Sequence, residues 1–345
     1  MLLLLVAIEP AHAWAQCAVC GNPAFAVGDN DLRRSFLPGT PSGVRVTTAL
    51  LFASQRYSDI YEGSRRLSGS EKAAIMFTPD WLLQTHVVSL VMGVELSSGT
   101  QLQVLAPYAV ANATRLADSD NGDAVDSAGN AIDTKADQGL SDVEFRLRQR
   151  LRPLLKARAW PLGLRDIIFS VGAVAPSGGF IAKDPNGVAP TGYASLGRGV
   201  WWLTADLEAL GAVGARFGWV IGASARLPQT TITNAGFLFR WGKEVRSHGA
   251  LTALVVPKLL SFSFGAEWLW RGKGEERLFE GLPIDVFPNG GGRWLTLVPS
   301  IQVQLPGRLA LHAAVRVPMW RTVGGLQPTQ GLGWTLGLSG ALGAI

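Results

Sequence analysis

The sequence has little charge, almost no cysteine and no long apolar run. Charged residues make up 17% of 345 positions, against about 25% in typical soluble domains, and there are 2 cysteines. No stretch of about 18 apolar residues occurs, which excludes a conventional transmembrane helix. Lysine and arginine form no block, and no aromatic-rich binding motif is present. The net charge of +5 therefore does not indicate nucleic-acid binding, and no nucleic-acid partner is predicted.

The most informative pattern present is an alternation of polar and apolar residues. Within residues 140–152 a charge falls on nearly every second position, and similar alternation recurs along most of the chain. A period of two indicates β-strands whose two faces meet different surroundings. The chain also has 41 glycines, which suit tight turns, and 12 tryptophans, which suit a membrane interface. The sequence predicts an all-β, antiparallel transmembrane β-barrel, apolar toward lipid and polar toward a lumen.

We predict about 12 strands, with 14 as the alternative count, because single-chain outer-membrane barrels favour even numbers. Residues 245–257 are the weakest part of this assignment, and Ala250 to Val256 could add strand. Long connections alternate with short ones, as outer loops alternate with periplasmic turns. This parity makes 228–233 a short outer loop and puts His248 in a periplasmic turn. The predicted strands are 44–57, 82–96, 100–112, 140–152, 164–176, 199–211, 214–227, 234–244, 258–271, 293–305, 308–319 and 331–343.

The N-terminal residues have the pattern of an export signal. Residues 2–8 form a short apolar core, and Ala13-Trp14-Ala15 fits a small-x-small cleavage site. The predicted organisation is a signal peptide (1–15), a periplasmic N-terminal arm (16–43) and the barrel (44–345). The expected location is the outer membrane of a Gram-negative bacterium. Expected partners are outer-membrane lipids, lipopolysaccharide, the barrel-assembly machinery and a small-molecule solute, and the arm is available to a periplasmic partner.

The two cysteines, Cys17 and Cys20, form a Cys-x-x-Cys motif in the predicted arm. Export exposes them to oxidising conditions, which favours a disulfide between them. A c-type haem site needs histidine after the second cysteine, where Gly21 stands. A metal site would need two further ligands, and none is close in sequence. The pair is therefore a disulfide candidate, a metal or redox role is the alternative, and no cofactor is predicted.

Inward-facing charges are the candidate functional residues. They could pair across strands and plug the interior, or line a path and orient polar solutes through a transverse field. The sequence favours neither interpretation. If the lumen is open, Arg146 and Arg148 are expected to set its charge selectivity. The residues predicted to line the lumen are Asp142, Glu144, Arg146, Arg148, Asp206, Glu208, Arg216, Glu267 and Arg316.

The histidines offer no recognisable catalytic motif. His86 and His312 are assigned to the lumen, and neither they nor His248 stand beside a serine in a nucleophile motif. No catalytic residues are predicted.

Two local motifs carry a resemblance to a known family. Residues 139–150 open with a G-[LI]-[SG]-D-[VL] pattern before a charged strand, and Pro176-Ser177-Gly178 ends the next strand. In these features the chain resembles the bacterial outer-membrane transporter-like barrels typified by phenol-degradation meta-pathway proteins. More loosely, residues 17–23 resemble the cysteine-bearing lead of related barrels. The resemblance covers residues 40–345 and implies a barrel that passes small organic compounds, with no defined substrate and no catalytic residues.

The function expected from these observations is an outer-membrane channel or passive transporter for small organic molecules, aromatic or hydrophobic in character. The alternative is a structural barrel or sheath in an outer-membrane complex, including an electron-transfer conduit, with which the Cys-x-x-Cys arm is compatible. A barrel enzyme is the third and least supported class.

Overall fold

The fold is known from a computed structural model, which describes much of the chain from residue 43 onward. The predicted signal peptide, the arm and both cysteines lie outside the described residues. In the part of the chain that is described, no helix is long and apolar enough to cross a membrane. The described residues are 43–68, 71, 82–114, 134–152, 163–178, 197–214, 216–234, 237–256, 259–277, 285–286, 291–306 and 309–344.

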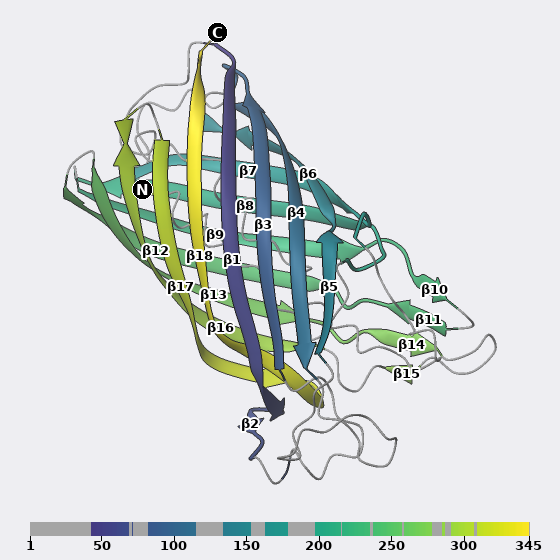
Figure 1. The fold of residues 1–345 in the computed structure, drawn as a ribbon. Helices are drawn as coiled ribbons and strands as arrows, with labels where there is room; N and C mark the ends of the chain where they lie inside the picture. Colours follow the sequence, from purple (N-terminus) through teal and green to yellow (C-terminus); the bar gives the residue numbers. More distant parts are fainter. Residues whose placement is uncertain are drawn as a thin grey trace.

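Twelve antiparallel strands close into one barrel, as the sequence predicts (Figure 1). Neighbours in sequence are neighbours in the sheet, and the last strand pairs with the first to complete the ring. One of the twelve is interrupted at Ser141-Asp142 and is therefore counted as β5 and β6. The barrel strands are β1 (Arg45–Glu62), β3 (Leu82–Glu95), β4 (Thr100–Thr114), β5 (Thr134–Leu140) with β6 (Val143–Arg150), β7 (Leu164–Ala175), β8 (Trp202–Val213), β9 (Phe217–Pro228), β12 (Glu244–Val256), β13 (Leu260–Arg271), β16 (Gly292–Leu305), β17 (Leu309–Val323) and β18 (Leu326–Ala344).

Short strands outside the barrel gather at the end opposite the C-terminus (Figure 1). β2 (Arg65–Arg66) pairs with the end of β1. A separate small sheet has the order β10-β11-β14-β15, so it joins the connection after β9 to the connection after β13. At the other end, Gly99 and Gly214 adopt left-handed φ values of 81° and 64° in short turns, which glycine adopts without strain. This arrangement makes the end with the small sheet the outer end. The strands of the small sheet are β10 (Ile232–Asn234), β11 (Phe237–Arg240), β14 (Glu275–Arg277) and β15 (Asp285–Val286).

One predicted strand was wrong. The sequence pattern placed a strand at 234–244, whereas the barrel strand is β12, and β11 in the predicted range belongs to the small outer sheet. The reason lies in residues 247–250, Ser-His-Gly-Ala, which interrupt the alternation in the middle of β12, while the aromatic β11 carries a stronger strand signal. The predicted short outer loop at 228–233 is consequently the start of a longer connection. His248 lies in the barrel wall and not in a periplasmic turn.

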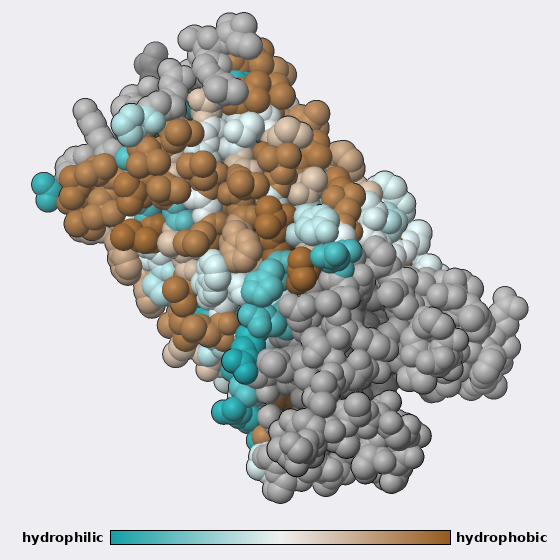
Figure 2. All heavy atoms as spheres, viewed as in Figure 1, coloured by the Kyte–Doolittle hydropathy of each residue, from teal (hydrophilic) through white to brown (hydrophobic). Residues whose placement is uncertain are grey.

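The outer surface of the barrel is apolar. In β13, Phe262 and Phe264 are 46% and 50% exposed, while the alternating Ser261 and Ser263 are buried. Figure 2 shows hydrophobic side chains spread over the barrel wall on the side in view. A protein in water would bury these side chains, so this surface faces lipid. The fold and the apolar wall are those of a bacterial outer-membrane β-barrel.

Candidate functional site: the charged interior

Strand alternation directs the predicted lumen charges inward, with one exception. Eight of the nine side chains are buried inside the barrel. Arg216 is instead exposed in the turn between β8 and β9, because the inward alternation of β9 starts only after Phe217. The sequence prediction for Arg216 was therefore wrong. The eight buried residues are Asp142, Glu144, Arg146, Arg148, Asp206, Glu208, Glu267 and Arg316.

Glu144 is the centre of the interior charge network. Its two carboxylate oxygens lie 3.0 Å from Arg146 Nη2 and 3.0 Å from Arg226 Nη2. Arg146 also pairs with Asp206, at 3.3 Å from Nη1 to Oδ2. The three strands involved, β6, β8 and β9, are not all adjacent, so these side chains tie the wall together across its inner face. A second carboxylate, that of Glu267, lies within 3.6 Å of the guanidinium groups of both Arg246 and Arg316.

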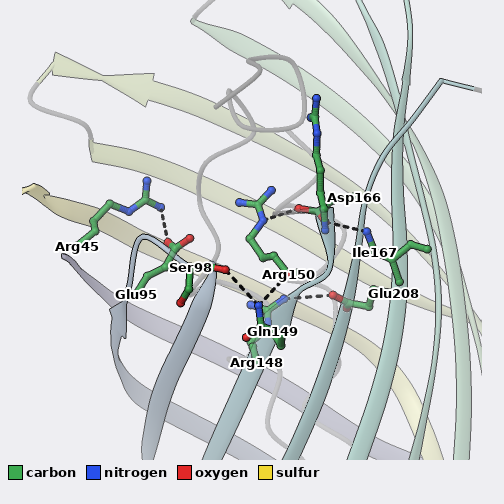
Figure 3. A network of polar contacts seen from close by, with 10 residues as sticks. Arg45, Glu95, Ser98, Arg148, Gln149, Arg150, Asp166, Ile167 and Glu208 are labelled. Carbon is green, nitrogen blue, oxygen red and sulfur yellow. Dashed lines mark hydrogen bonds and ion pairs between the residues drawn. The ribbon is translucent and has the colours of Figure 1, made fainter. Parts of the chain in front are cut away.

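Toward the inner end of the barrel, the network continues through a separate group of pairs (Figure 3). Arg148 Nη2 lies 3.2 Å from Glu208 Oε2 and His248 Nε2 lies 3.6 Å from Glu208 Oε1. Arg150 donates to Asp166 at the end of β6. Arg45 and Glu95, on β1 and β3, form another buried pair at 3.6 Å.

At the outer end the network centres on Arg198, in the segment just before β8. Its Nη1 lies 3.2 Å from Glu244 Oε1, and Arg271 Nε lies 3.3 Å from the same oxygen. The Arg198 guanidinium carbon also lies 4.2 Å from the ring centroid of Trp202, in cation–π geometry.

Several of these partners are absent from the residues predicted from sequence. Arg226 and Arg271 lie on inward faces of predicted strands, so the alternation could have found them. Glu244 and Arg246 belong to the misplaced strand. Arg198 lies outside any strand, where period-two alternation gives no signal.

The other side of the interior carries mainly neutral side chains. Along β1, β3 and β4, the buried inward residues include apolar Ala49, Ala53, Val87 and Leu105 and polar Thr47, Thr85, Ser89 and Gln103. The interior is therefore two-sided. Most ionic pairs lie on the wall from β6 to β13, with Arg316 of β17 pairing to Glu267, and the wall from β18 to β4 is mainly neutral apart from Arg45 and Glu95. In the ionic wall, the pairs cancel much of one another's charge, which leaves local dipoles and little net field.

Two of the histidines lie inside and one lies outside. His312 is 6% exposed in the interior and His248 contacts Glu208, as described above. His86 has the opposite parity from the inward Thr85 and Val87, and its ring stacks on Phe52 with centroids 5.9 Å apart. The sequence assignment of His86 to the lumen was therefore wrong.

The wall itself is interrupted between β17 and β18. Their ladder runs from Leu309↔Gly340 to Arg316↔Gly333 and stops there. Beyond it, residues 317–323 pair with β16 and residues 326–330 pair with β1. We call the interruption between residues 317–323 and residues 326–332 the split. Pro318 has no backbone N–H to donate, and register shifts accompany the interruption on both sides.

One polar side chain spans the split. Arg321 Nη1 donates to the hydroxyl of Thr329 and to the backbone oxygen of Gln330, so a side chain stands where the backbone ladder has ended. The guanidinium also lies 4.5 Å from the ring centroid of Tyr61. Apolar side chains flank the same region on the outside: Met319 is 56% exposed and Leu332 is 61% exposed.

Comparison with solved structures supports the fold. An outer-membrane channel from Pseudomonas putida F1 aligns with a TM-score of 0.62 and 12% identity, over 89% of this chain and 97% of that one. The Pseudomonas putida toluene transporter TodX aligns at 0.42 and 9% identity, over 90% and 92%. The NanC porin aligns at 0.41 and 8% identity, over 85% and 100%. The first alignment shows a shared fold alone, and the last two are too distant to support any argument. No protein-family model and no curated protein matches the sequence.

Proposed function

We propose that this protein is an outer-membrane channel for small hydrophobic or aromatic organic molecules, which leave the interior through the split. The observation that carries this proposal is the interrupted ladder between β17 and β18. A closed barrel has a complete hydrogen-bonded wall, and a solute can reach lipid only where that wall is incomplete. The exposed Met319 and Leu332 offer such a solute apolar surroundings at this place.

The interior charges support a hydrophobic solute more than an ion. The carboxylates of Glu144, Glu244 and Glu267 each contact two arginines, so an ion in transit would have to compete with close, buried pairs. A neutral molecule moving along the mainly neutral wall from β18 to β4 would break none of these pairs. The interior charges then serve to hold the barrel's shape and to give a polar side along which the solute is oriented.

The proposal predicts that Arg321→Ala raises passage of an aromatic solute several-fold. Removing the side chain deletes the polar bridge over the split and leaves the remaining barrel ladders intact. The matched control is Arg293→Ala, because Arg293 is an exposed arginine on the neighbouring β16 and pairs in register with Thr322 of β17. The measurement is uptake of radiolabelled toluene by Gram-negative cells whose outer membrane carries the native or variant barrel at equal abundance.

Three results would count against the proposal in different ways. Equal uptake by cells with and without the native barrel would refute the transport function. Faster native uptake that Arg321→Ala leaves unchanged would refute the route through the split. An equal increase from Arg293→Ala would attribute the effect to surface charge and not to the bridge.

A further inference from the structure

Between β5 and β6 the backbone ladder is interrupted, and side-chain hydrogen bonds connect the strand ends there. The β6–β7 ladder ends at Val143↔Ala175, and β5 pairs only with β4. The Ser177 hydroxyl accepts a hydrogen bond from Val143 N at 2.8 Å and donates one to Ser141 O at 2.9 Å. The two sequence motifs, Leu-Ser-Asp-Val and Pro-Ser-Gly, therefore meet in space at this break.

The Asp142 carboxylate at this break holds both ends of the connection between β7 and β8. Its Oδ1 accepts from Gly178 N at 3.1 Å and its Oδ2 accepts from Arg198 N at 2.8 Å. A side chain at Gly197 would not fit, because its Cβ would lie 2.4 Å from Asp142 Oδ1 and 2.6 Å from Gly178 O. The segment 197–201, here called the strap, is thus packed directly against Asp142.

The strap connects Asp142 to β12 along the charged wall. Arg198 Nη1 binds Glu244 on β12, with β7, β8 and β9 between that strand and β6. Trp241 Nε1 donates to Arg198 O at 2.9 Å, and the guanidinium carbon lies 5.8 Å from the Trp241 ring centroid. Arg198, which is 2% exposed, therefore connects the β5–β6 break to β12 at the outer end of the charged wall.

We propose that Arg198 is the residue that controls solute entry at the outer end, with Asp142 as its positioning residue. The inference rests on the proposed channel function. The strap closes the interior while the Arg198 guanidinium binds Glu244 and its backbone amide binds Asp142. A solute enters when these contacts separate. Glu244 keeps Arg271 as a partner when Arg198 moves away, so opening does not leave a buried carboxylate without an ion-pair partner.

The test is the potassium chloride current through the refolded full-length protein in a planar lipid bilayer, together with the toluene uptake described above. Arg198→Ala removes the bridge to Glu244, and Asp142→Asn removes the charge and one of the two acceptor oxygens. We expect each to raise mean conductance and uptake several-fold. Trp241→Phe keeps an aromatic ring, removes the hydrogen bond to the Arg198 carbonyl, and should give a smaller increase in the same direction.

The control is Arg246→Ala, which removes a buried arginine of equal size whose ion pair is with Glu267 on β13. It should change conductance and uptake much less than Arg198→Ala. If Arg246→Ala raised conductance and uptake as much as Arg198→Ala, the inference would be overturned, because any widening of the interior would then increase passage. Native passage that Arg198→Ala, Asp142→Asn and Trp241→Phe all leave unchanged would overturn it too, while the channel function would stand. If native and variant proteins all pass nothing, both proposals fail. Heat-modifiable gel mobility identifies any variant that has not folded, and the folded variants decide the outcome.

Discussion

Replacement of Glu144 by alanine is expected to lower the free energy of unfolding by about 3–5 kcal/mol, the usual cost of removing one partner from a buried ion pair. The carboxylate is 2% exposed and lies 3.0 Å from each of two guanidinium groups, on Arg146 and Arg226. Its loss removes the carboxylate that these two guanidinium groups share, and of the two carboxylates that pair with Arg146 only Asp206 remains, in a medium that solvates charge poorly. Urea-induced unfolding in lipid vesicles, followed by the change in gel mobility, measures the effect.

The matched control for this prediction is Glu62→Ala. Glu62 pairs with Arg65 at 2.9 Å, a similar distance, but both side chains are 56% exposed. Water replaces a lost partner at such a site, so little change is expected. Glu144→Gln should fall between the two, because the amide oxygen still accepts one hydrogen bond but carries no charge. If Glu144→Ala cost no more than Glu62→Ala, the interior would have to be well hydrated, and the close pairing would not be a source of stability.

This pairing changes the role expected for the arginines of residues 140–152. Alternation assigns Arg146 and Arg148 to the interior, where an open lumen would let them set charge selectivity. In the structure, Arg146 binds Glu144 and Asp206, and Arg148 binds Glu208. Substituting glutamate for either would bring like charges together inside the barrel, so folding would suffer before any selectivity could be read.

The sequence could predict the barrel because side-chain period and fold are directly linked. Each strand has one face toward lipid and one toward the interior. In β13 and β8, apolar and polar residues alternate accordingly along the strand. It could not predict β12 well, because glycine and alanine near His248 blur the two faces. Strand order is also predictable, since neighbours in an up-and-down barrel are neighbours in sequence.

The site was less predictable because its partners are set by depth and curvature. Arg148 and Glu208 lie on β6 and β8, with β7 between them. They meet only because the β6–β7 register and the β7–β8 register together place them at the same height in the barrel. Alternation fixes only the face of a residue and not its height along the barrel axis. Arg198 carries no periodic signal at all, and the split follows from register shifts near Pro318 that alternation does not report.

Replacement of Phe264 by arginine is expected to cost about 2–4 kcal/mol in membrane insertion, the range for arginine on the lipid face near the bilayer midplane. Phe264 lies near the middle of β13 and is 50% exposed on the outer surface. Its register partners are Leu251, 70% exposed, and Pro299, so no polar side chain of these neighbours could compensate a charge. The long arginine side chain would have to extend along the strand to reach water.

The control for Phe264→Arg is the same substitution at a different depth in the bilayer. Phe217→Arg introduces the same charge at a residue that is 59% exposed but starts β9, beside the turn at Gly214. Near an interface the cost should fall to about 0–1 kcal/mol. Phe264→Leu keeps the site apolar and should insert almost as well as the native protein. The measurement is the folding equilibrium in vesicles over a urea gradient. Equal costs at positions 264 and 217 would mean that the apolar outer surface of the barrel does not span a bilayer in the orientation described, because only a lipid environment makes the same substitution depend on its height along the strand.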